Sequence, residues 1–473
     1  MIAGPRAGET KIYWDILEVR RVKGEVRKKA RNEGRPGYKK TRVGWIPKGW
    51  ACVKFVDVSK LVRGPFGGAL KKEIFVPSGY KVYEQQHAIY GDFNAGEYFI
   101  DEENYNRLKR FALQPGDIIM SCSGTAGCFA IFPPNANPGV INQALLKVRP
   151  QRRIITINFL YYFLNSQYFQ RNLFADFAGG AIKNIAGMPI IKKIPIPLPP
   201  LPEQKKIAEI LSAWDRAIEQ VGKLIDAKLR LKKGLMQQLL TGRMRFPEFN
   251  HETHERHEKD KGELPEGWKK VQLKNIAAIS FSGVDKKSRP WQKKVRLCNY
   301  MDVYNNHYIT ADMDFMWATA TDAEIEKYSL DVGDIMITKD SETPDDIGVP
   351  SVVTEKLDNV VCGYHLALIK PDLKKTDPIF LTKQIEYEQV ANQFSRLANG
   401  ATRFGLTTAA VKGVRLWLPE LEEQIRIAAV LSTCGREIEL LRRKEIALQE
   451  QKKGLMQKLL TGEVRVKADG AVI

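Results

Sequence analysis

Two stretches of the chain carry apolar residues at alternating steps of four and three. In the first stretch these residues are Ile207, Leu211, Trp214, Ile218, Val221 and Ile225, and Leu235 continues the same helix. In the second they are Ile427, Leu431, Cys434, Ile438 and Leu441, followed by Leu448, Leu455 and Leu459. This spacing is typical of a coiled-coil seam and predicts two long helices that pair with each other. The alternative is that each helix packs inside its own domain as an ordinary amphipathic helix.

The sequence also sets the ends of both helices. Pro199, Pro200 and Pro202 precede the first seam and cannot continue a helix backwards. Thr-Gly pairs at 241–242 and 461–462 supply the glycine that commonly follows a helix C-terminus. Each rod would be roughly 57 Å long, about 17 base pairs of duplex. The polar seam positions Glu445 and Lys452 are predicted to fix the register of pairing.

The two helical stretches are copies of one another. Residues 201–245 align without a gap on residues 421–465, and Lys-Lys-Gly-Leu-Met-Gln stands at both 232–237 and 452–457. Fainter matches precede them, at Ile-Pro-Lys-Gly-Trp 46–50 with Leu-Pro-Glu-Gly-Trp 264–268 and at Gly-Asp 116–117 with 333–334. The chain is therefore a duplication with the order variable, constant, variable, constant.

Each variable region mixes apolar, strand-like runs with loops rich in Gly, Ser, Asn and Lys. Residues 116–120 and 360–369 are examples of such runs, and an α+β fold is expected. The overall expectation is two α/β domains separated by two long antiparallel helices that form a coiled coil, related by a pseudo-two-fold repeat.

The composition favours a nucleic-acid partner without proving one. The 473 residues are 44% hydrophobic, and 74 Lys and Arg against 55 Asp and Glu give a formal net charge of +19, a field that attracts polyanions. The six cysteines show no disulfide or zinc spacing, which fits a reducing cytoplasm, and no apolar leader or membrane span is expected.

In the first variable region, cations that neutralise phosphates lie beside amides that can pair with base edges. The candidate contacts are Arg63, Lys71, Lys72, Lys81, Tyr83, Gln85, Gln86 and His87, with Ser123 and Thr125 from a glycine-rich turn after a predicted strand, and Lys183. A plain tight turn is an equally good interpretation of the glycine-rich segment.

The second variable region has a basic stretch followed by polar side chains. Its candidate DNA contacts are Lys286, Lys287, Ser288, Arg289, Lys293, Lys294 and Arg296, then Asn299, Tyr304, Asn305 and Asn306, with Arg403 further on. Solvated surface charge would give the same pattern.

Catalytic signatures are missing from the sequence, which has neither a phosphate-binding loop nor a methyltransferase fingerprint, so no catalytic residue is assigned. His251, His254 and His257 have a spacing that a metal site could use, but they lie in a charged linker, and no metal site is assigned.

The layout resembles the specificity subunits of type I restriction-modification systems. The resemblance is carried by Leu-Pro-Pro-Leu-Pro-Glu-Gln at 198–204, the Gly-Leu-Met-Gln helix ends, the Leu-Leu-Thr-Gly exits, residues 44–50 and the Gly-Gly-Ala-Ile-Lys-Asn-Ile segment at 179–185. It covers nearly the whole chain.

The resemblance implies a domain order and a function. We expect a basic extension at 1–42, target recognition domains at 43–197 and 263–417, helical spacers at 198–246 and 418–466, a charged linker at 247–262 and a tail at 467–473. Each recognition domain would read half of a bipartite, asymmetric double-stranded DNA site. Two methyltransferase subunits would dock on the helices, and two restriction subunits would join them. S-adenosylmethionine, ATP and Mg²⁺ would belong to those partners, in a cytoplasmic complex associated with the nucleoid.

Two other classes of protein remain open on the residues alone. A helical scaffold would assemble proteins and use its positive charge for solubility, so its binding to DNA would show little dependence on salt. An S-adenosylmethionine-dependent enzyme of unfamiliar sequence would bind that cofactor in isolation.

Overall fold

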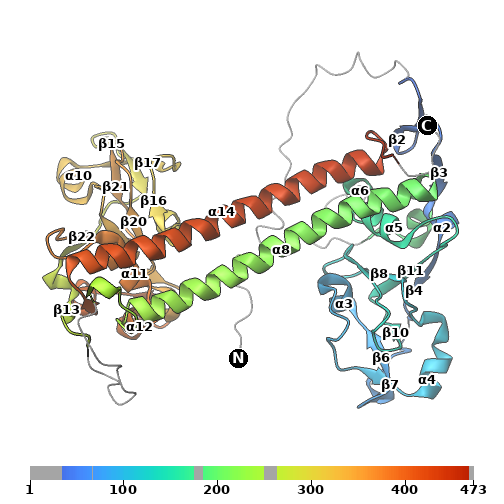
Figure 1. The fold of residues 1–473 in the computed structure, drawn as a ribbon, viewed down its shortest axis with the longest axis horizontal. Coiled ribbons are helices and arrows are strands. Elements are labelled where there is room, and N and C mark those ends of the chain that lie inside the picture. The colour runs from blue at the N-terminus through green and yellow to red at the C-terminus, as the bar shows by residue number, and fades with distance from the viewer. Residues whose placement is uncertain (1–34, 67, 175–184, 250–263, 468–473) are drawn as a thin grey trace. The chain divides into compact units, whose positions relative to one another are not determined.

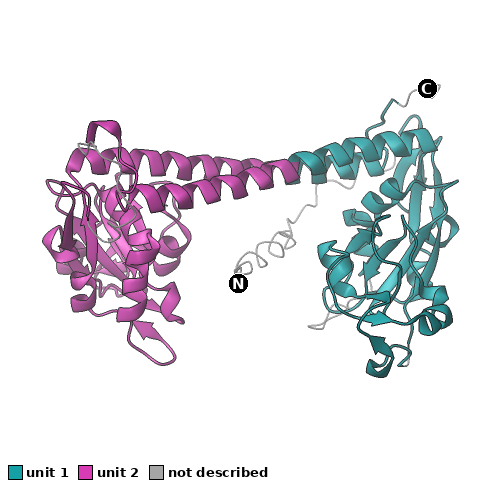
Figure 2. Ribbon diagram, turned by 60° about the horizontal axis from the view of Figure 1, so that its bottom comes forward, with its two compact units in different colours: residues 1–217, 448–473 teal, residues 218–447 magenta. Residues whose placement is uncertain are grey.

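The computed structural model describes residues 35–66, 68–174, 185–249 and 264–467. Contacts divide the chain into two compact units, residues 1–217 with 448–473 and residues 218–447 (Figure 2). The boundary falls inside both long helices, so each unit combines one variable region with the start of one helix and the end of the other. The extension predicted at 1–42 and the linker at 247–262 lie mostly outside the described residues, and the predicted domain limits remain predictions.

Unit 1 is built on two four-stranded sheets (Figure 1). The antiparallel sheet has the order β4 (Ser59–Arg63), β11 (Leu145–Pro150), β8 (Ile118–Ser121) and β9 (Phe129–Ile131). The other has the order β10 (Gly139–Ile141), β6 (Tyr80–Tyr83), β7 (Phe99–Ile100) and β5 (Phe75–Val76). Smaller pairs are β1 (Tyr38–Thr41) with β2 (Gly44–Pro47) and β3 (Ala51–Lys54) with β12 (Pro195–Leu198).

The helices of unit 1 cap these sheets and fill its core. They are α2 (Phe55–Val58), α3 (Gln85–Tyr90), α4 (Glu102–Arg107), α5 (Ile157–Leu164), α6 (Gln167–Leu173) and α7 (Met188–Ile191). Phe159, Phe163 and Phe169 from α5 and α6 are buried against β8 and β11 in the main apolar cluster. Apolar burial of this kind is the main driving force for the fold.

Unit 2 repeats the same plan. Its larger sheet has the order β14 (Ala277–Phe281), β22 (Leu366–Pro371), β18 (Ile335–Thr338), β20 (Pro350–Val353) and β16 (Tyr308–Ile309). The second sheet is β17 (Met316–Ala320), β15 (Lys293–Cys298) and β21 (Val360–Cys362), and two-stranded pairs join β13 (Lys269–Gln272) to β24 (Arg415–Leu418) and β19 (Asp340–Ser341) to β23 (Phe404–Gly405). Its shorter helices are α9 (Tyr300–Asn305), α10 (Asp322–Tyr328), α11 (Pro378–Glu386), α12 (Glu388–Leu397) and α13 (Thr408–Gly413).

The long helices α8 (Leu201–Leu239) and α14 (Leu421–Leu460) are packed together, as the seam predicts (Figure 1). In unit 1 the start of α8 shares a core with the end of α14, and in unit 2 the end of α8 shares one with the start of α14, so the paired segments run in opposite directions. Most of the predicted pairing residues are buried: Ile207, Leu211, Val221, Ile225, Ile427, Leu431, Cys434 and Ile438. Trp214, Ile218, Leu235, Leu441 and Leu455 are half-buried.

The alternative interpretation of the seams also holds in part, because the helix starts are built into the domains. Ile207 and Leu211 pack in the same cluster as Phe159 and the strands of unit 1. The polar seam residue Lys452 contacts Asp215 across the helix pair, as expected of a position that fixes register.

A buried glutamate at the start of each long helix contacts residues from other motifs of the internal repeat. In unit 1, Glu203 accepts a hydrogen bond from the Trp50 indole at 2.9 Å and pairs with Arg465 beyond the end of α14. In unit 2, Glu423 accepts from the Trp268 indole at 3.1 Å and pairs with Arg245 beyond the end of α8. The two clasps use equivalent residues of the duplication.

The helix-ending glycines complete each clasp. Gly462 has φ of +70°, and a Cβ there would lie 2.5 Å from Pro47, while Gly242 has φ of +67° and its Cβ would lie 2.3 Å from Pro265. Only glycine tolerates both the left-handed backbone and this contact. The Pro-x-Gly-Trp motifs therefore recur because they cover the exits of the helices.

Two details of the predicted strands are wrong. The run at 360–369 is broken into β21 and β22 by a turn at Gly363, where an added Cβ would lie 2.7 Å from the carbonyl oxygen of Cys298. Gly116, with φ of +87°, and Asp117 form a turn before β8 rather than part of the strand. Among the described residues, no helix combines the length and the apolar character needed to cross a membrane.

Candidate nucleic-acid interface

In unit 1, three separate elements bring polar candidate residues to one end of the antiparallel sheet. Arg63 ends β4, and Ser123 follows β8; both strands pair with the start of β11 there. Gln85 begins α3, and its side-chain carbonyl accepts a hydrogen bond of 3.1 Å from the Ser123 hydroxyl. An amide and a hydroxyl held together in this way present donors and acceptors suited to base edges.

The turn that carries Ser123 is stabilised by a hydrogen bond between its own residues. The Ser121 hydroxyl donates to the carbonyl of Thr125 at 2.7 Å, while Ser123 and Thr125 themselves are exposed. Cys122 lies between Ser121 and Ser123 and is buried. This burial raises the pKa of its thiol to about 12, against an opposing effect of the nearby Arg63 charge. The turn thus presents two hydroxyls on a fixed backbone, with a cation beside it.

Lys81 and Tyr83 do not belong to this surface, because β6 is covered on both faces. The Lys81 ammonium is buried and donates to the carbonyl of Asn94 at 2.7 Å; burial lowers its pKa. The Tyr83 hydroxyl donates to Asn137 at 2.5 Å, and burial raises its pKa to about 12. Both polar groups are used inside the fold. The sequence of β6, in which one lysine stands among apolar and aromatic residues, does not reveal that both sheet faces are covered.

The remaining candidates of unit 1 are dispersed. Gln86 follows Gln85 on α3 and contacts Glu84 at 3.2 Å, and the ring of His87 is buried against the carbonyl of Ala95. Lys71 and Lys72 are exposed beside the short 3-10 turn Lys72–Ile74 that precedes β5. Lys183 lies outside the described residues.

Unit 2 forms a cluster at the equivalent place, with different side chains. Tyr300 begins α9, as Gln85 begins α3, and it lies near Arg403, Ser341 and Asp340. The pKa of Tyr300 is raised by burial and by Asp346. Asp340 follows β18 and contacts Nδ1 of His365 at 2.7 Å. This cluster offers phenol hydroxyl and imidazole groups where unit 1 offers an amide and small hydroxyl groups, and each cluster has an arginine beside it.

Apart from Arg403, no residue named in this second cluster was predicted from the sequence as a DNA contact. Lys339 lies over the ring of Tyr364, 4.4 Å from its centroid, and Tyr364 meets His365 edge to face. Lys339, Tyr364 and His365 all lie just after the end of a strand. That position is the feature of the sequence that could have indicated them as surface candidates. Arg403, which the sequence did single out, is exposed beside β23.

The basic stretch of unit 2 lies on and before β15. Lys286, Lys287, Lys293 and Lys294 are exposed, and Asn305 is exposed at the end of α9. Lys293 is paired with Asp322 at 2.5 Å, and Arg289 lies 3.6 Å from Asp285. Lys294 and Arg296 lie over the ring of Trp317.

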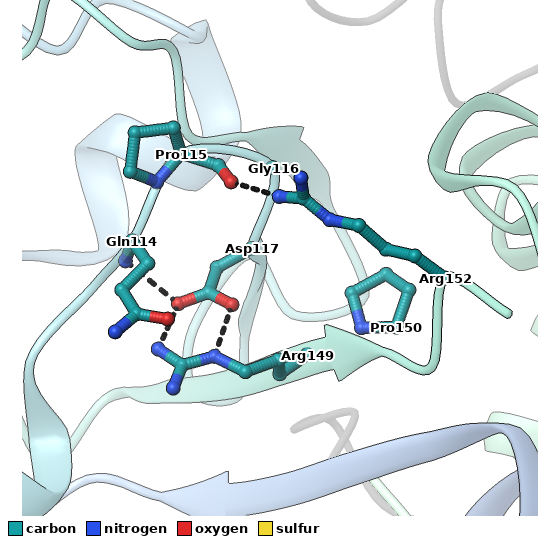
Figure 3. A pocket seen from close by; sticks show the side chains of 7 residues that line it. All are labelled: Gln114, Pro115, Gly116, Asp117, Arg149, Pro150 and Arg152. Carbon is teal, nitrogen blue, oxygen red and sulfur yellow. Dashed lines mark hydrogen bonds and ion pairs between the residues drawn. The ribbon is translucent and has the colours of Figure 1, made fainter.

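A hollow at the opposite end of β8 from Ser123 has a structural role (Figure 3). There Arg149 forms a bidentate pair with the buried Asp117, and the guanidinium of Arg152 donates to the carbonyl of Pro115. Unit 2 has the equivalent pair Lys370 with Asp334 at 2.9 Å. Since the pair recurs in both halves and anchors the turn before the strand, we exclude the hollow from the interface.

Comparison with known proteins agrees with this architecture. The family model of the type I restriction modification DNA specificity domain matches residues 47–228 and again 265–450. The type I restriction enzyme MjaVIII specificity subunit of Methanocaldococcus jannaschii is 26% identical over 435 residues, which are 89% of this chain and 94% of the relative.

Two solved structures share the fold at low sequence identity. The type I restriction-modification S subunit from M. genitalium is 16% identical with a TM-score of 0.52, and the match covers 87% of this chain and 96% of that one. A chain from a structural study of complex assembly and conformational transition of the type I system is 17% identical with a TM-score of 0.52, covering 89% and 99%.

The chain belongs to the type I restriction-modification DNA specificity family. It is the DNA specificity subunit of such a system, the non-catalytic member that works with DNA and with the other subunits of the complex.

Proposed function

We propose that each unit reads one half of a bipartite, asymmetric DNA site. The observation that carries the proposal is the pair of equivalent clusters, around Gln85 and Ser123 in unit 1 and around Tyr300 and His365 in unit 2. They occupy the same topological place in two copies of one fold, yet their hydrogen-bonding groups differ. Different groups on a shared frame would select different bases in the two half-sites.

The long helices set the distance between the two half-sites. Support comes from the continuous runs of α8 and α14 and from the polar contacts that fix their register, Lys452 with Asp215 and Lys228 with Glu437 at 2.5 Å. The cations near the clusters, with Arg63 in unit 1 and Arg403 in unit 2, would neutralise phosphates and position the duplex.

Two methyltransferase subunits dock on these helices, at the repeated hexapeptides 232–237 and 452–457. Support comes from Gly234 and Gly454, which are exposed near the C-terminal ends of α8 and α14 and have nothing within 4 Å of an added Cβ among the described residues. A helix glycine costs about 1 kcal/mol relative to alanine, and no packing within the described part of the chain compensates this cost. Close approach of a partner backbone would explain both glycines, and their equivalence fits two copies of one partner.

The other members and cofactors follow from the same proposal. Two restriction subunits complete the nuclease form, and S-adenosylmethionine, ATP and Mg²⁺ serve the partner subunits in the cytoplasm, where the complex associates with the nucleoid. This chain supplies the choice of site and the frame on which the partners assemble.

Mapping of adenine methylation in the host genome tests the DNA-reading proposal. We expect one motif made of two short blocks with a fixed gap. Replacing residues 43–197 by the same region of another specificity subunit should change one block and keep the other. A motif with a single block, or a change in both blocks, would contradict modular reading.

Native mass spectrometry of the complex tests the docking proposal. Gly234→Leu should remove one methyltransferase copy, and the double change with Gly454→Leu should remove both, while the melting midpoint of the free chain is equal to or above that of the wild type because leucine is the better helix former. Ala213→Leu, at an exposed position of α8 outside the hexapeptide, is the matched control. Two bound copies on the double variant would refute docking at the glycines.

A further inference from the structure

Arg296 of β15 has an unusual environment for a charged side chain. Its guanidinium carbon lies 6.0 Å from the ring centroid of Phe315 and 5.8 Å from that of Trp317, the residue directly opposite it in the sheet. The side chain is half-buried, and its Nε is buried without a hydrogen-bond partner in the described part of the chain. Two aromatic rings therefore flank a cation whose Nε has no hydrogen-bond partner among the described residues.

The buried lysines of the described residues are satisfied internally. Lys81 donates to Asn94 at 2.7 Å, Lys147 donates to the carbonyls of Arg110 and Ala112, and Lys383 pairs with Glu386 at 2.7 Å. A buried donor of a charged group left without a partner is costly, and such groups are rare in native folds. Arg296 is the cation among the described residues that has such an atom.

The ring that flanks Arg296 is itself exposed to an unusual degree. Trp317 is 59% exposed and Trp291, in the loop before β15, is 79% exposed. Lys294, on the same face of β15, has its ammonium 5.7 Å from the Trp317 centroid. The equivalent pair of unit 1, Lys81 over Phe99 at 5.9 Å, is closed off by the carbonyl that Lys81 binds. In unit 2 the ring of the equivalent pair, Trp317, is exposed.

We propose that Arg296 is a specificity-determining residue that reads a guanine in the half-site of unit 2. The planar guanidinium presents two parallel donors that match guanine O6 and N7 in the major groove. Its position between two rings limits its rotamers before binding, so less entropy is lost on contact. Lys294 would contact a neighbouring phosphate, and Trp317 is a positioning residue for the guanidinium.

The inference rests on the proposed modular reading of DNA, and it adds a chemical prediction to it. Arg296 lies four residues before Tyr300, or roughly 13 Å along an extended chain, within reach of the same duplex. The block read by unit 2 should therefore contain a G·C pair. A block composed of A·T pairs alone would overturn the assignment of Arg296 while leaving the two-block motif intact.

Competition binding tests the assignment, with the methyltransferase-bound complex and a set of duplexes that vary one base pair at a time. Arg296→Lys keeps the charge and removes the fork, so it should reduce discrimination at one G·C pair of that block by about 5- to 150-fold. Discrimination at every other position should stay as in the wild type. Trp317→Leu should reduce discrimination at the same pair by a smaller factor, because it removes one of the two rings.

Lys294→Ala is the matched control for a phosphate contact. It should weaken binding to all duplexes alike and reduce the slope of log affinity on log salt by about 0.9. If Arg296→Lys behaves in the same uniform way, or leaves discrimination unchanged, Arg296 does not read a base. Melting midpoints of each variant identify any loss of folding, and loss of the two-block motif in the wild type would refute the proposed function instead.

Discussion

Glu203 and Arg465, which are 262 positions apart in the sequence, form a bidentate ion pair with distances of 2.6 and 3.0 Å. The pair joins the start of the first long helix to the segment that follows the second. With Trp50 it closes unit 1 around both ends of the repeat. Glu423 and Arg245 close unit 2 in the same way, but Arg245 is more buried than Arg465.

The difference in exposure predicts different energetic costs for the two clasps. Arg245 is 10% exposed, so Glu423→Gln leaves a buried cation without its carboxylate and should cost about 3–5 kcal/mol. Arg465 is 50% exposed, so Glu203→Gln should cost about 1–2 kcal/mol after solvent screening. Urea unfolding of each variant measures the difference. Equal losses would show that exposure of the arginine does not set the cost.

The seam predicts that a charge inside the helix pair disrupts assembly. Leu431→Lys buries an unpaired charge and should cost several kcal/mol, with loss of partner binding. Leu211 and Ile218 should behave in the same direction. Leu440→Lys is the control on the same helix, since Leu440 is 64% exposed and its replacement should change stability by less than about 0.5 kcal/mol. Intact assembly with altered base choice would contradict the role of the seam.

The environment of the Tyr308 hydroxyl predicts that substitution of Gly435 can stabilise the fold. The Tyr308 hydroxyl is buried without a partner among the described residues, and it lies 4.0 Å from where a Cβ of residue 435 would stand. The equivalent residue of unit 1, Asp215, accepts a hydrogen bond of 2.7 Å from Tyr162. Gly435→Asp should therefore provide an acceptor, and Gly435→Ala alone should add up to about 1 kcal/mol from helix propensity.

A double-mutant cycle separates the two effects at this position. Tyr308→Phe should be neutral or stabilising in the wild type, because it removes an unsatisfied hydroxyl. In the Gly435→Asp background the same change should destabilise by about 1 kcal/mol, since it then removes a hydrogen bond. Equal effects in both backgrounds would show that the aspartate and the tyrosine do not interact.

Lys147 predicts a rise of stability with pH. Burial, reinforced by the charges of Arg149 and other cations, lowers its pKa to about 8 in the folded protein, against 10.5 for a free lysine. Between these values the unfolded chain binds more protons at this residue, so its contribution to the unfolding free energy rises with pH. Below pH 8 the ammonium is charged in both states and the slope disappears.

Chemical unfolding of wild type and Lys147→Met at a series of pH values checks this contribution. The difference in unfolding free energy should grow in favour of the wild type from about pH 8 to about pH 10.5 and be constant below. A constant difference across the whole range would show that Lys147 keeps its ordinary pKa in the folded state.

The strand residues show why part of the candidate site could not be predicted. Lys81 and Arg296 occupy equivalent strand positions, each opposite an aromatic residue, and they look alike in the sequence. Lys81 is buried and donates to Asn94 of a neighbouring loop, whereas Arg296 is half-buried beside the exposed Trp317 and its Nε has no partner among the described residues. Similarly, Gln85 and Ser123 are 38 positions apart and meet only through the sheet.

The sequence by itself determined the duplication, the two long helices with their ends, and the family. These features depend on local periodicity, on proline and glycine at helix ends, and on repeated motifs, all of which are written in neighbouring residues. The tertiary structure alone decided that each unit takes the start of one helix and the end of the other, and which polar side chains gather at the end of each sheet. The physical reason is that burial and hydrogen bonding between distant segments depend on which surfaces pack together, and no local pattern records that choice.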